Sequence, residues 1–373
     1  MRIVPWSLAL LFACAAAHAQ PAPQLAGKAW LLADLTSGQV LTEEKADERF
    51  APASLTKLMS AYVVFGALRD RQLASTSHVE VSERAWRAPG SRMFVQPGMT
   101  VVVDELIHGM VVQSGNDASI ALAEMVAGSE EKFTQLMNRE AARLGMKNTH
   151  FANASGYSAA QHYSTARDLS VLAGALIRDF PEPYARYYAG KEYRYNNITQ
   201  INRNRLLWLD PSVDGVKTGY TEAAGYCLVA SSRRGGRRLL SVLLGAQSDS
   251  ARAQESQKLL NWGYQFFDGV RLFAGSEAVK AVAVWKGSVS EVQAGFAEGL
   301  VVTVPKGQAG KLKAELLTHP PVVAPVLRGQ RVGVLRVQLD GKPLGEYPVE
   351  ALESVGVAGF FGRTWDTLRL LSR

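Results

Sequence analysis

Cysteine and histidine are scarce in this chain, which has two cysteines and six histidines among 373 residues. Cys14 lies within an N-terminal apolar run, so its removal would leave Cys227 alone and exclude an internal disulfide. No His-Glu-x-x-His, Cys-x-x-Cys or Gly-x-Ser-x-Gly motif occurs, and the histidines are isolated from one another. We therefore expect no metal site and no cofactor.

Long apolar runs are also rare. The one pronounced run, Ile3–Ala17, follows Arg2 and leads into Ala17-His18-Ala19, a small-x-small pattern typical of signal peptidase sites. Its length of about fifteen residues is short of the roughly twenty that a membrane-spanning helix needs. We expect residues 1–19 to be a cleaved signal peptide. A lipoprotein signal ending at Cys14 is the alternative, and the bulky Phe12 disfavours it.

Positive charge is in modest excess, because 41 Lys and Arg residues stand against 34 Asp and Glu, which gives a net charge of +7. The basic pairs Arg233-Arg234 and Arg237-Arg238 flank two glycines, which indicates a hairpin turn. Aromatic residues are not interleaved with basic ones in the way that nucleic-acid-binding surfaces require, so we expect no nucleic-acid partner. An exported basic protein suits anionic surfaces such as lipid headgroups or cell-wall polymers.

Three short motifs follow each other along the chain: Ser54-x-x-Lys57, Ser114-Gly-Asn116 and Lys217-Thr-Gly219. Any one of them is weak, because a second S-x-x-K occurs by accident at Ser129–Lys132. The informative feature is their order, with gaps of about sixty and one hundred residues. Together they supply a nucleophile, a base, a second hydroxyl and a cation beside a strand.

Ser54 and Lys57 share one face of the helix predicted over Ser54–Arg69. That helix is apolar on nearly all sides, so it is expected to be buried, and burial lowers the proton affinity of a lysine from its free pKa of roughly 10.4. A neutral Lys57 can accept the hydroxyl proton of Ser54 while the serine attacks a carbonyl. Ser114 is then a candidate proton relay to the leaving amine, and Asn116 a candidate donor to Lys57 or to the substrate.

The Lys217-Thr-Gly219 motif is predicted to lie on an edge strand, where a peptide substrate can add as a further strand. Lys217 supplies a fixed positive charge, Thr218 a hydroxyl for a carboxylate, and Gly219 permits close approach. The backbone N–H groups of Ser54 and Tyr220 are candidates for an oxyanion hole.

The hydrophobic pattern predicts an α+β fold. Strands are expected within Ala29–Leu41 and at Val216–Tyr220, Tyr226–Ser232 and Leu239–Ala246, whereas helices are expected in between and at the end of this region: Val101–Val112, Asp117–Ala127, Glu130–Gly145, Ser164–Leu176 and Glu255–Phe267. Short valine-rich runs then predict a small all-β domain. The expected boundaries are 20–268 for the catalytic domain, 269–358 for the β domain and 359–373 for a terminal helix.

The terminal helix has an amphipathic pattern. Phe360, Phe361, Trp365 and Leu368 fall on one side at about 100° per residue, and basic residues fall on the other. We expect it to lie in the headgroup plane of a membrane, with docking on the protein's own core as the alternative.

Four segments resemble sequence motifs of the serine D-alanyl-D-alanine carboxypeptidases, the low-molecular-mass penicillin-binding proteins. They are Pro52–Lys57, Ser114–Ala118, Tyr163–Asp168 and Asp214–Gly219. The resemblance covers essentially the whole mature chain. It implies a penicillin-binding/β-lactamase-like catalytic domain, with an antiparallel sheet and a helical subdomain. It also implies a Ser54 acyl-enzyme, a peptidoglycan stem peptide ending in D-Ala-D-Ala as substrate, and acylation by β-lactams as inhibitors.

Arg252 resembles a family arginine near the substrate's terminal carboxylate, and a surface arginine at a helix start is its alternative interpretation. Tyr220 stands where some members of the family carry histidine. A class A β-lactamase would need a Glu-x-x-Leu-Asn-like segment, and none lies between Asn116 and Lys217.

We expect a periplasmic carboxypeptidase that removes the terminal D-alanine of peptidoglycan pentapeptides and is peripherally attached to the outer face of the cytoplasmic membrane. A DD-endopeptidase that cleaves peptidoglycan cross-links, and an inactive penicillin-binding wall scaffold, stay open as alternatives.

Overall fold

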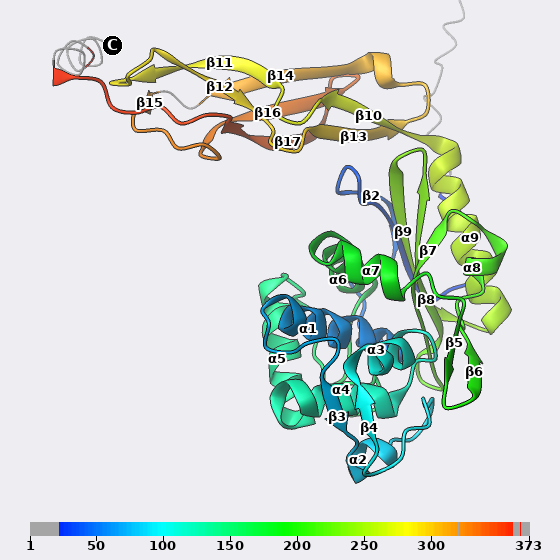
Figure 1. Ribbon diagram of the computed structural model, residues 1–373. Coiled ribbons are helices and arrows are strands. Elements are labelled where there is room, and N and C mark those ends of the chain that lie inside the picture. Colours follow the sequence, from blue (N-terminus) through cyan, green and yellow to red (C-terminus); the bar gives the residue numbers. More distant parts are fainter. Residues whose placement is uncertain (1–21, 319–320, 361–365, 367–373) are drawn as a thin grey trace, which may run out of the picture.

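The computed structural model describes residues 22–318, 321–360 and 366. Its first part is built on a five-stranded antiparallel sheet in the order β2-β1-β9-β8-β7 (Figure 1). The strands are β1 (Ala29–Asp34), β2 (Gln39–Glu44), β7 (Val213–Thr221), β8 (Gly225–Arg234) and β9 (Arg237–Ala246). Because β1 and the middle of β8 and β9 are buried residue after residue, both faces of this sheet are covered.

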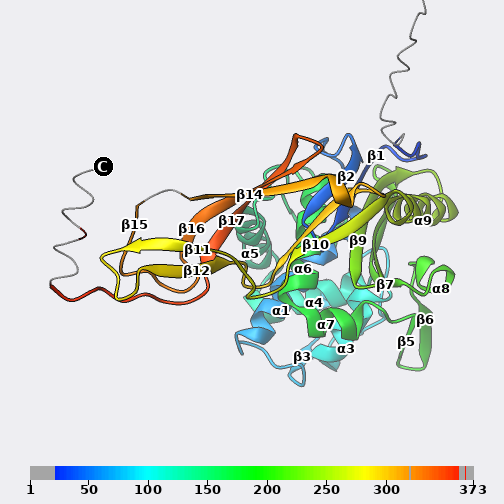
Figure 2. The ribbon, with the colours of Figure 1, turned by 90° about the horizontal axis from the view of Figure 1, so that it is seen from above.

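Helix α9 (Asp249–Phe266) packs on β8 and β9, whereas α6 (Ala166–Asp179) packs on β1 and β9 from the helical side (Figures 1 and 2). The helical subdomain lies beyond α6 and centres on α1 (Lys57–Arg69) and α4 (Asn116–Ala127). The remaining helices are α2 (Glu83–Trp86), α3 (Val103–Val111), α5 (Glu130–Arg143), α7 (Pro181–Tyr187) and α8 (Leu206–Leu209). Small two-stranded antiparallel sheets are formed by β3 (His78–Glu80) with β4 (Thr100–Val102) and by β5 (Glu192–Tyr195) with β6 (Ile198–Ile201).

The predicted α+β architecture is confirmed, with corrections to several elements. Ser54 lies in a 3-10 turn, Ala53–Thr56, and the α-helix begins only at Lys57. The helix expected over Val101–Val112 begins at Val103, because Thr100–Val102 pairs as a strand with β3. The helix expected from Glu255 begins at Asp249, where the Ser248 side chain accepts a hydrogen bond from the Ala251 N–H and caps it.

The second part of the molecule is the predicted all-β unit (Figure 1). A six-stranded sheet has the order β14-β16-β17-β12-β11-β15, and β10 pairs with β13. The strands are β10 (Phe267–Phe273), β11 (Ala278–Trp285), β12 (Glu291–Gly295), β13 (Leu300–Pro305), β14 (Leu312–Thr318), β15 (Val322–Val323), β16 (Arg331–Leu339) and β17 (Lys342–Ala351). The valine-rich runs do not predict β10, β12 or β15, and Phe267 belongs to β10 rather than to the helix before it.

The two parts meet at Thr303 of β13. Its hydroxyl donates to Asp34 Oδ2 at 2.7 Å and lies 2.7 Å from Ser37 Oγ, while its backbone N–H donates to Gln39 Oε1 at 2.6 Å. Asp34 is fully buried and also forms an ion pair with Arg237. From this junction the β unit extends so that β15 lies at the end farthest from α9 in both views (Figures 1 and 2).

Among the described residues, none of the helices is both long enough and apolar enough to cross a bilayer. The predicted signal peptide and almost all of the predicted amphipathic tail lie outside the described residues.

Candidate active site

The side chain of Lys57 is buried at the start of α1 and makes three polar contacts. Its Nζ lies 3.1 Å from Ser54 Oγ, and it donates to Asn116 Oδ1 at 2.6 Å and to the Ser155 carbonyl at 2.6 Å. The 3-10 turn places Ser54 three residues ahead of Lys57, so the two side chains meet as the motif predicted.

The electrostatics around Lys57 favour a neutral amine. Burial, aided by the nearby Arg203 and opposed by Asp117, lowers the pKa of Lys57 to about 7. The pKa of Lys217 is also lowered well below its usual range, by burial and by the positive charges of Lys57, Arg203 and Arg252. Two buried ammonium groups in one site repel each other, so the site disfavours protonation of both at once.

Ser114 lies between α3 and α4, and Asn116 is the first residue of α4. The Ser114 hydroxyl is buried and has no hydrogen-bond partner among the described residues. Asn116 differs from the prediction, because it accepts from Lys57 instead of donating to it, while its Nδ2 donates to the Pro89 carbonyl at 2.6 Å. This second contact fixes the amide so that Oδ1 faces the lysine.

Asp117 anchors the loop beside this motif. Its buried carboxylate accepts from the backbone N–H groups of Met93 at 2.8 Å and Phe94 at 2.9 Å. The loop leads on from Gly90 and Ser91, which line the cavity in front of Ser54.

The Lys217-Thr-Gly219 motif lies on β7, the edge strand of the described five-stranded sheet, as predicted. Gly219 faces the 3-10 turn, where an added Cβ would come within 3.1 Å of the Pro52 carbonyl oxygen and 3.3 Å of Ala53 Cβ. A side chain at this position would therefore push the strand away from Ser54. Tyr220 is half exposed and packs on Tyr226, with ring centroids 4.3 Å apart.

Arg252 lies in the beginning of α9 rather than ahead of it, and its guanidinium is buried. It donates to the Gly219 carbonyl at 3.2 Å, pairs with Asp249 and lies over the Tyr226 ring. The surface-arginine alternative is therefore wrong, and Arg252 holds the end of β7 against α9.

One cavity of about 870 Å³ brings these elements together. Its lining includes the predicted Ser54, Ser114, Asn116, Thr218, Gly219, Tyr220 and Arg252. Lys57 and Lys217 lie buried behind it. Among the described residues, no group of three or more His, Cys, Asp or Glu side chains is arranged to hold a metal ion.

Two parts of the site were missed from the sequence. Arg203 lines the cavity and acts electrostatically on both lysines, although it lies in no recognised motif. The segment Asn153–Tyr157 supplies the Ser155 carbonyl to Lys57 and lines the cavity with Gly156 and Tyr157. The glycine is a signal in principle, because Gly156 has a φ of +83° and an added Cβ would lie 1.8 Å from the Ala53 carbonyl oxygen.

A buried histidine supports the same turn without entering the cavity. His162 Nδ1 accepts from the Ala152 N–H at 3.2 Å, so its proton is on Nε2, which donates to Thr56 Oγ1 at 2.8 Å. Burial, with His150 and Lys57 nearby, lowers the pKa of His162 to about 4. The ring is therefore neutral at physiological pH.

Comparison with known proteins shows to which family the chain belongs. Residues 15–248 match the family described as D-alanyl-D-alanine carboxypeptidase, and residues 267–357 match the family described as penicillin-binding protein 5, C-terminal domain. The chain belongs to the D-alanyl-D-alanine carboxypeptidase family. The family named by the resemblance is thereby confirmed.

Relatives match almost the whole chain. D-alanyl-D-alanine carboxypeptidase DacC of Escherichia coli strain K12 is 47% identical over 362 residues, which covers 95% of this chain and 90% of that protein. The crystal structure of penicillin binding protein 5 from Haemophilus influenzae has a TM-score of 0.85 at 36% identity, and the match covers 90% of this chain and 99% of that one. The predicted penicillin-binding fold, with its added β domain, is therefore confirmed.

A third neighbour bears on inhibitors. Penicillin-binding protein D2 from Listeria monocytogenes, whose structure is in the ampicillin-bound form, has a TM-score of 0.61 at 30% identity, covering 66% of this chain and all of that one. The β-lactamase, endopeptidase and inactive-scaffold alternatives are not favoured, because the family and the long relatives are described as carboxypeptidases.

Proposed function

We propose that Ser54 is the nucleophile with which this serine D-alanyl-D-alanine carboxypeptidase removes the terminal D-alanine of a peptidoglycan pentapeptide. The observation that carries the proposal is the contact of Ser54 Oγ with a buried lysine amine whose pKa lies near 7. A lysine that is half neutral at physiological pH can act as a base, whereas an exposed lysine with its usual pKa cannot.

Acylation then proceeds in two steps. Lys57 takes the Ser54 proton as Oγ bonds to the carbonyl carbon between the two D-alanines, and the backbone N–H groups of Ser54 and Tyr220 stabilise the oxyanion. The C–N bond breaks next, and the proton returns through the Ser114 hydroxyl to the amine of the departing D-alanine. Water hydrolyses the resulting Ser54 ester and restores the free hydroxyl.

The substrate's terminal carboxylate is assigned to the positive end of the cavity. Thr218 offers a hydroxyl there, Lys217 and Arg252 offer positive charge, and Arg203 lines the same cavity. A bound carboxylate favours the protonated form of Lys217, and that charge in turn keeps Lys57 neutral. Gly219 lets β7 lie close to the turn that carries Ser54, so that a peptide bound along β7 beside Tyr220 is near the nucleophile.

β-Lactams present a reactive amide and a carboxylate at similar positions, so we propose that they acylate Ser54 as inhibitors. The ampicillin-bound neighbour supports this reading.

The test combines mass spectrometry after incubation with penicillin and D-alanine release from a diacyl-Lys-D-Ala-D-Ala peptide. The wild-type chain should carry one adduct, on Ser54, and release D-alanine. Lys57→Arg should do neither, because a guanidinium stays charged and cannot accept the proton. Lys132→Arg is the matched control, since Lys132 belongs to the accidental S-x-x-K on the surface helix α5. Turnover by Lys57→Arg at the wild-type rate would overturn the base role, and an adduct without D-alanine release would point to an endopeptidase or a non-hydrolytic binder.

We further propose a periplasmic enzyme attached peripherally to the outer face of the cytoplasmic membrane. The export-type N-terminus, the excess of basic residues and the amphipathic pattern after residue 358 support this. The proposed segments are a signal peptide at 1–19, a catalytic domain at 20–268, a β domain at 269–358 and a membrane-associating helix at 359–373. Truncation after Val357 should abolish co-sedimentation with anionic liposomes while leaving D-alanine release intact. Unchanged co-sedimentation would mean that the terminal segment docks on the protein instead.

A further inference from the structure

The two oxygen acceptors at Lys57 orient its lone pair. A neutral amine has two N–H bonds and one lone pair, and the Asn116 and Ser155 oxygens, each 2.6 Å from Nζ, take up both N–H bonds. The lone pair is then left to face the third neighbour, Ser54 Oγ. The ability of Lys57 to act as a base therefore depends on where these two oxygens are held. The Ser155 carbonyl belongs to a loop, and Asn116 is the first residue of α4.

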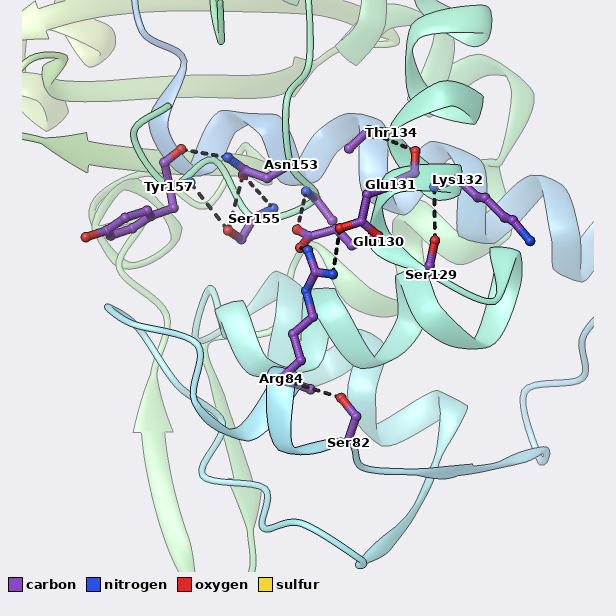
Figure 3. A network of polar contacts seen from close by, with 12 residues as sticks. Ser82, Arg84, Ser129, Glu130, Glu131, Lys132, Thr134, Asn153, Ser155 and Tyr157 are labelled. Atoms are coloured by element: carbon purple, nitrogen blue, oxygen red, sulfur yellow. Dashed lines mark hydrogen bonds and ion pairs between the residues drawn. The ribbon is translucent and has the colours of Figure 1, made fainter. Parts of the chain in front are cut away.

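The Ser155 carbonyl is held by a tight turn over Asn153–Tyr157 (Figure 3). Asn153 Oδ1 accepts from the Gly156 N–H at 2.8 Å and the Ser155 N–H at 3.2 Å, and Asn153 Nδ2 donates to the Tyr157 carbonyl at 2.8 Å. These contacts fix the shape of the turn, but all of them are internal to it. They do not fix where the turn lies relative to Lys57.

Two contacts reach the turn from outside at Ala154. The Ser60 hydroxyl on α1 donates to the Ala154 carbonyl at 2.6 Å, and the second contact comes from Glu130. This residue is buried at the beginning of α5, and its Oε1 accepts from the Ala154 N–H at 2.9 Å. Its Oε2 accepts from Arg84 Nη2 at 2.7 Å, so the carboxylate bridges the turn and helix α2 (Figure 3). Arg84 also pairs with the exposed Glu131 at 2.6 Å.

The second acceptor, Asn116, is held by a residue that follows helix α2 in the chain. The chain runs from Arg84 to Pro89, whose carbonyl accepts from Asn116 Nδ2 and thereby turns Asn116 Oδ1 toward Lys57. One buried carboxylate thus joins the two loops that hold the two acceptors of the base.

We propose that Glu130 is a positioning residue for the general base: by binding the Ala154 N–H and Arg84 it holds the Ser155 carbonyl, and through α2 the Asn116 amide, where they direct the Lys57 lone pair at Ser54. The inference rests on the proposed base role of Lys57. Glu130 itself does not contact Lys57 or Ser54 and takes no part in bond making.

The discriminating pair of variants is Glu130→Gln and Glu131→Gln. A glutamine at position 130 has the same shape but only one acceptor oxygen, so its NH₂ must face either the Ala154 N–H or Arg84, both of which are donors. Glu131→Gln removes the negative charge of a neighbouring ion pair with the same arginine and leaves the turn untouched. Arg84→Ala is a second variant, at an exposed position, for the case that Glu130→Gln does not fold.

The measurement is the second-order rate constant for acylation by a chromogenic cephalosporin as a function of pH, normalised to the fraction of sites that a saturating penicillin labels. Glu130→Gln should lower the plateau rate about ten- to hundredfold, since small misplacements of catalytic groups have costs of this order. The rising part of its pH–rate profile should move to lower pH, because the ammonium form of Lys57 loses the Ser155 acceptor that stabilises it. Asp117, Arg203, Lys217 and His162, the other titratable groups around Lys57, are the same in every variant.

Arg84→Ala should change the rate in the same direction by less, and Glu131→Gln should match the wild type. Equal rates for Glu130→Gln and Glu131→Gln would overturn the proposal. A rate lowered in proportion at every pH, with the rising part of the profile unmoved, would also overturn it, because that is the result of a purely structural role. If Lys57→Arg proves fully active, the function proposed above fails first, whereas an inactive Lys57→Arg with a normal Glu130→Gln rejects this inference alone.

Discussion

Lys57 is a buried amine whose protonation sets the reactivity of Ser54. Burial, together with Arg203, lowers the pKa of Lys57 to about 7, and the neighbouring Lys217 shares the site. Below that pH the amine is an ammonium with no lone pair, and above it the base is available. The sign of the pH dependence follows directly from this.

Acylation should therefore rise about tenfold per pH unit below pH 7 and level off above it. The measurement is the acylation rate of the wild-type chain between about pH 5 and pH 9. His162 stays neutral over that range, because its pKa is lowered to about 4, so the transition reports the two lysines as a pair. A flat profile would contradict the assignment of Lys57 as base.

Ser114 carries a buried hydroxyl without a partner among the described residues, and Ser256 on α9 is a second such case. Removing an unsatisfied hydroxyl loses no hydrogen bond, so both Ser114→Ala and Ser256→Ala should leave the free energy of unfolding unchanged or slightly raised. Only Ser114 lines the cavity. Its loss should slow acylation by about 10²-fold or more, as expected for a proton relay.

Chemical denaturation and acylation kinetics on the same preparations check both parts. A Ser114→Ala variant that is less stable and equally active would show that the hydroxyl serves the fold and not the reaction.

Helix α9 is the element that ties the edge strand to the cavity. Its N-terminal cap is Ser248, and Arg252, one turn later, holds the Gly219 carbonyl. Ser248→Ala should lower the free energy of unfolding by about 1 kcal/mol, the usual cost of a lost cap. It should also raise KM for the diacyl-Lys-D-Ala-D-Ala peptide, because Arg252 is then less firmly placed.

Thr165→Ala is the matched control. Thr165 caps α6 through the Asp168 N–H at 3.0 Å, and it does not line the cavity. It should lose similar stability without a change in KM. Equal KM values for both variants would reject a link between the cap of α9 and substrate binding.

At the scale of the whole molecule, a polar junction around Thr303 joins the catalytic part to the β unit. Thr303→Val removes the hydroxyl contacts to Asp34 and Ser37 but keeps the backbone contacts to Gln39. We expect a loss of about 1–3 kcal/mol at the junction and a broader range of orientations of the β unit, measured by small-angle X-ray scattering. Release of D-alanine from a short peptide should not change.

Thr318→Val, on an exposed position of β14, makes the same substitution away from the junction and should leave the scattering profile as it is. If Thr303→Val also leaves the scattering profile unchanged, the backbone contacts and the covalent connection suffice to hold the two parts together.

Local patterns in the sequence determined the α+β architecture, the order of its main elements and the residues expected in the site. Ser54 and Lys57 are three positions apart, hydrophobic periodicity indicates the helices and strands, and glycines indicate the turns. These features need no tertiary information. The family was confirmed on the same segments, whereas the catalytic roles stay predictions that the experiments above address.

Tertiary structure alone decided what surrounds the base. The Ser155 carbonyl, Arg203 and Glu130 all lie far from Lys57 along the chain. Their effect arises from loops brought together by packing of α1, α4 and α5. A backbone carbonyl leaves no mark on residue type, and the depth of burial that lowers the pKa of Lys57 is a property of the assembled core.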